Sequence, residues 1–81
     1  MNAINTLTNR IVIDPEKCNG KPIINGQRIT VQTILEFLSC GDSIEDVQKA
    51  YPTLEKEDIY ACLAYASQVM NHHSMTYNIV A

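Results

Sequence analysis

The sequence predicts a mainly α-helical fold in which a short β-ribbon precedes three helices. Two β-branched runs flank the Asn25-Gly26 pair, a pattern typical of strands joined by a tight turn. After the ribbon, apolar residues recur at helical spacing in three segments, which Gly41 and Pro52 separate. At 81 residues the chain forms one domain. We expect a flexible N-terminus over residues 1–9, a folded domain over residues 10–70 and a C-terminal tail over residues 71–81.

The ribbon is predicted from its turn residues. Residues 10–13 form a strand that Asp14-Pro15 ends, because Pro lacks the donor that a sheet ladder needs. Residues 22–24 and 27–29 are expected to pair as a hairpin around Asn25-Gly26. We predict a type I′ turn there, with positive φ at both central residues. Asn19-Gly20 marks a second turn.

Capping residues mark the first two helices. Thr30 is a suitable N-cap for the first helix, which Gly41 ends as the residue after its C-cap. Ser43 and Asp46 have the spacing of a capping box, and they open a second helix that ends before Pro52. The apolar face of the first helix is made of Val31, Ile34, Leu35 and Leu38.

The third helix is predicted to start near Leu54 and to reach Met70. Its first turn is acidic, which suits the positive end of a helix dipole. Its expected apolar stripe is Ile59, Cys62, Leu63, Ala66 and Met70. The second and third helices have helix-turn-helix spacing, although packing alone also produces such pairs. Met75 to Val80, in the tail, could add a strand or dock on a partner.

Composition narrows the function classes. The net charge of −3 does not suggest a nucleic-acid binder, so any phosphate contact must come from a local basic patch. Three widely spaced cysteines without a C-x-x-C pair suit free thiols in a reducing cytosol. No apolar run approaches the ~20 residues of a membrane span. We therefore expect a soluble, cytoplasmic protein.

No group of residues suggests catalysis, a metal or a cofactor. His72 and His73 are adjacent, so on a helix they point in different directions and do not converge on one ion. Cys62 lies on an apolar stripe and is expected to pack as a small hydrophobic residue. The carboxylates cluster at helix starts, where helix dipoles account for them. We expect a non-enzymatic protein without a metal site.

The ribbon carries the best candidates for DNA contact, namely Lys17, Lys21 and Arg28. The start of the third helix is less suitable, because Glu55, Glu57 and Asp58 would repel phosphates. An alternative interpretation is that the ribbon cations only keep a sheet edge soluble and resistant to aggregation.

These residues together resemble a known family, the domain-of-unknown-function 433 (DUF433) proteins, over roughly residues 10–66. The matching residues, in order, are Ile13-Asp14-Pro15, Gly20-Lys21-Pro22, Gly26-x-Arg28-Ile29, the helix from Thr30 to Leu38, Gly41, Tyr51-Pro52-x-Leu54, Glu57-Asp58-Ile59, Ala61 and Leu63-Ala64-Tyr65-Ala66. Two positions depart from the pattern: Gln27 stands where Thr is usual, and Glu55 where Thr or Ser is common.

The resemblance implies a homeodomain-like helix-turn-helix fold with an N-terminal β-element. It also implies the role of the antitoxin in a type II toxin–antitoxin pair, which binds and neutralises a PIN-like ribonuclease toxin and binds its own promoter DNA. The residues themselves support only a small non-enzymatic binding module, so an interaction or structural module without DNA affinity remains the alternative. We expect a homodimer, because the chain is short and 46% hydrophobic and because the ribbon edge at residues 11–13 and 23–24 could pair with a second copy.

Overall fold

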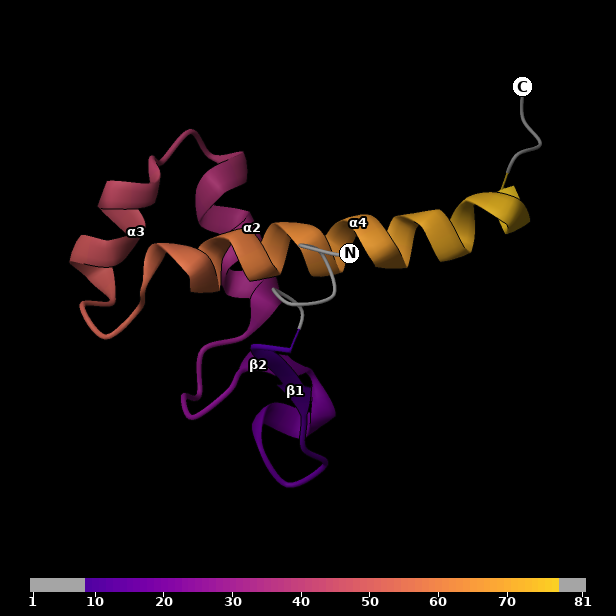
Figure 1. Ribbon diagram of the computed structural model, residues 1–81, viewed down its shortest axis with the longest axis horizontal. Helices are drawn as coiled ribbons and strands as arrows, with labels where there is room; N and C mark the ends of the chain where they lie inside the picture. The colour runs from indigo at the N-terminus through magenta and orange to yellow at the C-terminus, as the bar shows by residue number, and fades with distance from the viewer. Residues whose placement is uncertain (1–8, 78–81) are drawn as a thin grey trace.

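The fold is mainly helical, with a two-stranded antiparallel sheet at the N-terminal side (Figure 1). A computed structural model of the chain describes residues 9–77, with side chains described for residues 9–71. In chain order the elements are β1 (Ile11–Ile13), the short turn η1 (Cys18–Gly20), β2 (Pro22–Ile24), α2 (Val31–Ser39), α3 (Ile44–Ala50) and α4 (Lys56–Tyr77). Most of the predicted flexible N-terminus lies outside the described residues.

The sheet pairs β1 with β2. The predicted hairpin, in which residues 22–24 pair with residues 27–29, is therefore wrong as the main strand pairing. Ile11 lies opposite Ile24, and Val12 opposite Ile23. After the turn the chain makes only an isolated bridge between Ile23 and Thr30. Pairing stops at Thr30 because this residue already caps α2.

The turn at Asn25-Gly26 is also of a different type. The amide of Gln27 donates to the carbonyl of Ile24 over 2.9 Å, which closes a four-residue turn. Gly26 has φ +84°, whereas Asn25 keeps a negative φ. A type I′ turn needs positive φ at both positions, so one positive φ at the third residue is the pattern of a type II turn. Type I′ suits two strands that continue to pair, and here the second strand gives way to a helix.

A left-handed turn joins β1 to β2. Cys18, Asn19 and Gly20 have φ of 51°, 59° and 76°. The amide of Gly20 donates to the carbonyl of Lys17, and the amide of Lys21 donates to that of Cys18. The predicted turn at Asn19-Gly20 is thus confirmed. It also includes Cys18, although cysteine is not a residue that predicts a turn.

The predicted caps of α2 and α3 are confirmed. Thr30 Oγ1 accepts from the amide of Thr33 at 3.1 Å. Gly41, at φ +98°, donates to the carbonyl of Leu38, while the next amide donates to that of Phe37, which is a Schellman ending. Ser43 and Asp46 form the reciprocal capping box of α3, with bonds of 2.9 and 3.0 Å.

The helix α4 begins later and ends later than predicted. It starts at Lys56, since the Asp58 carboxylate accepts from the amide of Glu55 and caps the helix there. It continues through Tyr77, so a strand over residues 75–77 is wrong, and residues 78–81 lie outside the described part. Residues 53–81 contain neither Gly nor Pro, so no helix breaker stops α4 near Met70.

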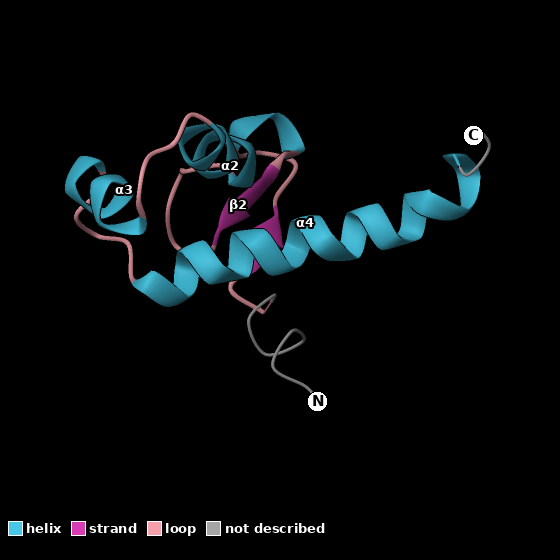
Figure 2. Ribbon diagram, turned by 90° about the horizontal axis from the view of Figure 1, so that it is seen from above, coloured by secondary structure: helices cyan, strands magenta, loops and turns pink. Residues whose placement is uncertain are grey.

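The core lies where the sheet, α2 and α3 meet the first half of α4. Figure 2 shows β2 and α2 along one side of α4, and α3 near its start. The buried cluster consists of Ile24, Val31, Ile34, Val47, Leu54, Ile59 and Cys62. Phe37 and Tyr51 meet edge to face at its margin, with ring centroids 5.9 Å apart. Within residues 9–77, no helix is apolar over enough length to cross a membrane.

Candidate functional site

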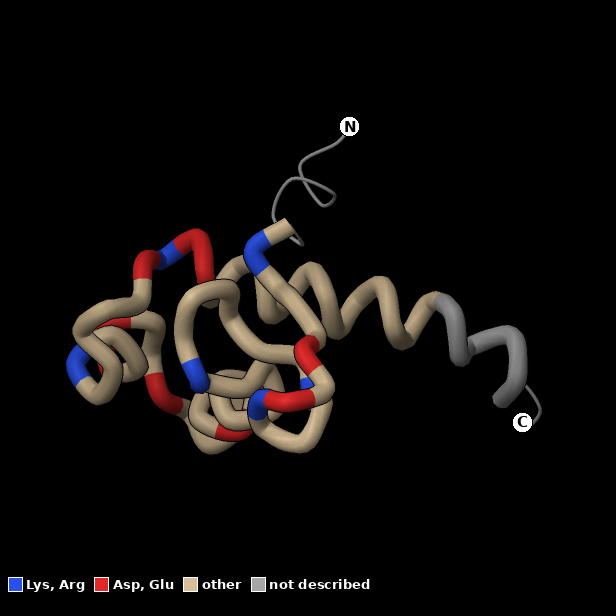
Figure 3. Tube along the Cα trace, turned by 90° about the horizontal axis from the view of Figure 1, so that it is seen from below, with Lys and Arg blue, Asp and Glu red and all other residues tan. Residues whose placement is uncertain are grey.

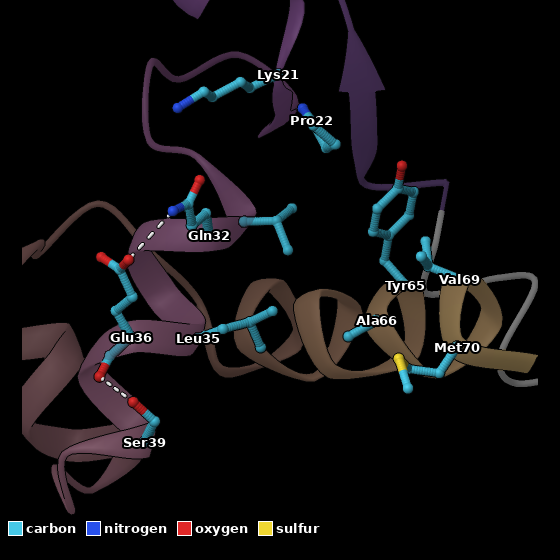
Figure 4. A pocket seen from close by; sticks show the side chains of 11 residues that line it. Lys21, Pro22, Gln32, Leu35, Glu36, Ser39, Tyr65, Ala66, Val69 and Met70 are labelled. Atoms are coloured by element: carbon cyan, nitrogen blue, oxygen red, sulfur yellow. Dashed lines mark hydrogen bonds between the residues drawn. The ribbon is translucent and has the colours of Figure 1, made fainter. Parts of the chain in front are cut away.

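An apolar groove of about 490 Å³ opens on the surface between α2 and the middle of α4 (Figure 4). From α2 it is lined by Val31 and Leu35 among others, and from α4 by Tyr65, Ala66, Val69 and Met70. Lys21 and Glu36 also line it and are both exposed, so they place one charge of each sign at its rim. The groove therefore offers a mainly hydrocarbon surface with little net charge.

The groove exists because the core-facing stripe of α4 is longer than the helix that covers it. Cys62 is fully buried, and Tyr65 and Val69 follow it at helical spacing on the same side. Tyr65 is half-buried and Val69 is 37% exposed. Beyond them α4 projects clear of the other elements (Figure 1). The apolar face of α4 is thus covered at its start and open at its middle.

A second exposed apolar surface lies on the outer side of α4. Tyr60 is 41% and Leu63 45% exposed. The predicted apolar stripe is wrong at Leu63, because one residue of helix turns the side chain about 100° away from Cys62. It is also wrong at Met70, which is 65% exposed. Ala61 and Ala64 are buried instead. We call Tyr60 and Leu63 the outer face of α4.

The three candidate DNA-binding residues lie in the loops around the sheet. Lys21 and Arg28 are exposed, and Lys17 is half-buried. The thiol of Cys18 lies 3.6 Å from the carbonyl oxygen of Arg28, to which it donates, so the η1 turn and the loop after β2 are neighbours. Lys21 also lines a shallow polar hollow of about 370 Å³ at the start of α2, together with Cys18, Asn19, Thr30, Gln32, Thr33 and Glu36.

Arg10 binds two of the three carboxylates that the sequence places at the start of α4. Its Nη1 donates to Glu55 Oε1 at 2.8 Å and to Asp58 Oδ1 at 3.0 Å. These bonds, first to Glu55 and then to Asp58, raise the pKa of the guanidinium. Asp58 is buried, and its second oxygen caps the helix. No local pattern signals this contact, because Arg10 lies 45 and 48 residues from its two partners.

Cys62 is chemically quiet. Burial, and then the charge of Asp58, raises the pKa of its thiol to about 12. The nucleophilic thiolate is therefore absent near neutral pH. Among residues 9–71, no three His, Cys, Asp or Glu side chains gather as a metal site would require. The side chains of His72 and His73 lie outside the described residues.

Comparison with known proteins shows the family. A crystal structure of a DUF433 member protein from Anabaena variabilis ATCC 29413 matches with a TM-score of 0.73 and 29% sequence identity, covering 90% of this chain and 72% of that chain. Among curated proteins, none matches. The model of DUF433, described as a protein of unknown function, matches residues 11–66, which is most of the chain. The chain therefore belongs to the DUF433 family.

Proposed function

We propose that this protein is the antitoxin of a type II toxin–antitoxin pair, a non-enzymatic cytoplasmic protein that binds and neutralises a PIN-like ribonuclease. The partner class rests on the family resemblance, and one observation carries the binding role. Of the five large exposed hydrophobic residues in the described chain, four lie on α4. Apolar side chains gathered on one exposed element mark a protein-interaction surface.

The outer face of α4 is where we place the ribonuclease. Tyr60 and Leu63 are neighbours at i and i+3 on a helix that the core holds in place from the other side. A rigid helix loses little conformational freedom on binding, and Tyr is among the residues that most often dominate the energy of an interface. An antitoxin bound by this face would block the ribonuclease by covering its surface.

Promoter binding would use Lys17, Lys21 and Arg28 rather than the start of α4. The Arg10 pairs offset part of the acidic charge there, but Glu57 still adds a negative charge in the first turn. In a homeodomain-like helix-turn-helix arrangement, α3 and α4 would sit beside the duplex while the ribbon loops contact phosphates.

The charge of the molecule favours a second candidate, an interaction module without DNA affinity. The net charge is −3, and blue and red segments are interspersed along the described trace in Figure 3. A DNA-binding face usually concentrates Lys and Arg instead. On this alternative, Lys17, Lys21 and Arg28 keep the ribbon edge from pairing with other chains.

The test is a pull-down of the product of the neighbouring gene, expected to be a PIN-like nuclease, followed by a ribonuclease assay with increasing amounts of this protein. We expect stoichiometric inhibition, which Leu63→Glu should weaken by at least about tenfold, because a charge would be buried at the interface. Gln68→Glu is the matched control, since it adds the same charge at an exposed position on another side of α4. Full ribonuclease activity at saturating amounts of the unaltered protein would refute the antitoxin role.

A further inference from the structure

The groove between α2 and α4 is distinct from the proposed ribonuclease surface, because Tyr65 and Val69 in its lining lie roughly 120° or more around the helix from Tyr60 and Leu63. We propose that a second copy of this chain fills it, with the two α4 helices crossing antiparallel near Val69. Each helix then lies against the groove of the other copy. Three features support this dimer: the apolar stripe of α4 that is left uncovered, the absence of charged residues along most of α4, and the symmetry of the contact.

The groove is an unfinished part of the core. The stripe from Cys62 through Tyr65 to Val69 is covered by α2 at its start and open at its end. A domain of this size buries only about 60% of its unfolded surface, so an apolar face left open is a substantial loss. A helix that projects into water without packing is only marginally stable. An occupant that packs on the stripe would stabilise both the groove and the projecting half of α4.

The charge of α4 points to a second copy as the occupant. From Ile59 to Tyr77 the helix contains no Asp, Glu, Lys or Arg. In Figure 3 the described part of α4 is accordingly tan after its first turn. The groove is likewise apolar, and its two exposed rim charges, Lys21 and Glu36, are of opposite sign. An uncharged helix enters such a groove without leaving an ionised side chain buried and unpaired.

Symmetry makes this contact self-consistent. In a two-fold dimer the same patch serves on both copies, and α4 is itself one wall of the groove. A two-fold axis that runs between the two α4 helices at Val69 therefore places each projecting half against the groove of the other copy. Ala66, a small half-buried residue in the lining, lets the helix axes approach to about 8–10 Å.

This interface differs from the ribbon edge that the sequence suggested. Ile23 and Ile24 are each only 1% exposed, because they pack into the core of their own chain. Ile13, at 58%, is the one large hydrophobic residue of the described ribbon that is strongly exposed. The described ribbon therefore presents one exposed large hydrophobic side chain to a second copy, whereas the groove presents two, Val69 and Met70.

The first experiment is sedimentation velocity of the full chain over a range of concentrations, with Ala66→Glu and Ser67→Glu compared. Ala66 lines the groove, whereas Ser67 is exposed and does not line it. We expect the parent and Ser67→Glu to dimerise alike and Ala66→Glu to associate at least about tenfold more weakly. A monomeric parent, or equal dimerisation of all three proteins, would overturn the proposal.

A second experiment does not depend on the folding of Ala66→Glu. In a Cys40→Ser background, which removes the exposed thiol, Val69→Cys should form an intermolecular disulfide under mild oxidation, and Ser67→Cys should not. The bond requires Cα atoms within about 7 Å, which only the residue near the axis satisfies. Equal cross-linking at both positions, or none at position 69, would refute the crossing.

The proposed antitoxin role and the proposed dimer can be tested independently. Ala66→Glu is also tested for inhibition of the ribonuclease, with Gln68→Glu as its control, and Leu63→Glu is tested for dimerisation. We expect Leu63→Glu to remain dimeric while losing inhibition. If Ala66→Glu instead lost ribonuclease binding in a monomeric protein, the occupant of the groove would be the ribonuclease and not a second copy.

Discussion

Arg10 joins the first strand of the chain to the start of its last helix. Its guanidinium contacts Glu55, which is exposed, and Asp58, whose side chain is only 8% exposed. The exposed pair is of little value to stability, because water and salt screen it. The contact with Asp58 matters more, since a buried carboxylate without its partner is costly. Arg10 thus fixes the position of β1 by compensating a charge that also caps α4.

Replacing Arg10 should therefore destabilise the fold through Asp58. We expect Arg10→Met to lower the melting temperature by several degrees, as a domain this small responds strongly to small losses. The loss should be much smaller in an Asp58→Asn background, in which no buried charge needs a partner. Thermal unfolding followed by circular dichroism gives both values. Additive effects of the two changes would show that Arg10 acts through Glu55 or through packing instead.

Cys62 gives a pH dependence of definite sign. Its pKa is raised from 9.0 to about 12 in the folded chain, chiefly by burial. When the pKa of an acidic group is higher in the folded than in the unfolded state, the folded state becomes less stable as pH rises, because the unfolded state releases the proton at lower pH. The contribution of Cys62 is therefore constant below about pH 9 and decreases between pH 9 and pH 12.

Thiol alkylation at pH 8 should separate the cysteines of the folded protein. Cys40 is exposed and should react quickly, whereas Cys62 should react only after denaturation. Peptide mass mapping after brief labelling identifies the modified positions. Comparable labelling of Cys40 and Cys62 in the native protein would contradict the burial of Cys62.

At the scale of elements, the turn after β2 distinguishes two neighbouring residues. Gly26 has φ +84°, where a β-branched residue is strained even though open space surrounds it. Asn25 is exposed and has a negative φ, so it tolerates other side chains. We expect Gly26→Val to cost about 1–2 kcal/mol or more, and Asn25→Val to cost little. Urea unfolding gives the free energy of unfolding of both variants. Equal losses in the two variants would support the type I′ turn instead.

The second half of this turn is held by a contact that the sequence did not suggest. The side-chain amide of Gln27 donates to the carbonyl of Thr53 at 3.3 Å. The hydroxyl of Thr53 donates back to Gln27 Oε1 at 2.6 Å. These paired bonds fix the loop after β2 to the connection between α3 and α4.

The caps were predictable because each depends on residues three or four positions apart. Thr30, Ser43 and Gly41 fix the ends of α2 and α3 with their own side chains or backbone. The partner of β2 was not predictable in this way, since β1 competes with the segment after the turn and tertiary packing decides between them. The length of α4 was missed for a different reason: weak apolar periodicity after Met70 hid a segment that has no helix breaker.

The candidate site shows the same division. Exposure of Lys21 and Arg28 follows from their loops, which the sequence marked. The groove depends on where α2 ends relative to α4, and that is a property of packing that no local pattern carries. The outer face was hidden because Cys62 and Leu63 are adjacent apolar residues, and only one of them can face the core.

At the scale of the whole molecule, charged and apolar surfaces occupy different elements. The described cations near the sheet lie in its loops, while α4 beyond its first turn carries no charge. The ribonuclease and the phosphates would therefore meet different parts of the chain. Changes that abolish one activity should leave the other intact, which makes the two halves of the proposed function separable by mutation.

Measurements of promoter binding test whether the two halves of the proposed function are separable. Removing one cation that binds a phosphate should reduce the slope of log K against log salt by about one unit. We expect Lys21→Ala with Arg28→Ala to weaken promoter binding strongly and to flatten its salt dependence, since both side chains are exposed in neighbouring loops. Lys56→Ala should matter less, because Glu55 and Glu57 flank it in the sequence. Ribonuclease inhibition should survive all of these changes, as none lies on the outer face of α4.

Gel-shift titrations of the three proteins at two salt concentrations measure both affinity and slope. A loss of binding in Lys56→Ala, with the double variant unchanged, would make the start of α4 the element that contacts DNA. In that case Arg10 would acquire a second role, because it offsets the carboxylates of Glu55 and Asp58 beside Lys56. Absence of promoter binding by the unaltered protein at low salt would favour the module without DNA affinity, since electrostatic attraction is strongest there.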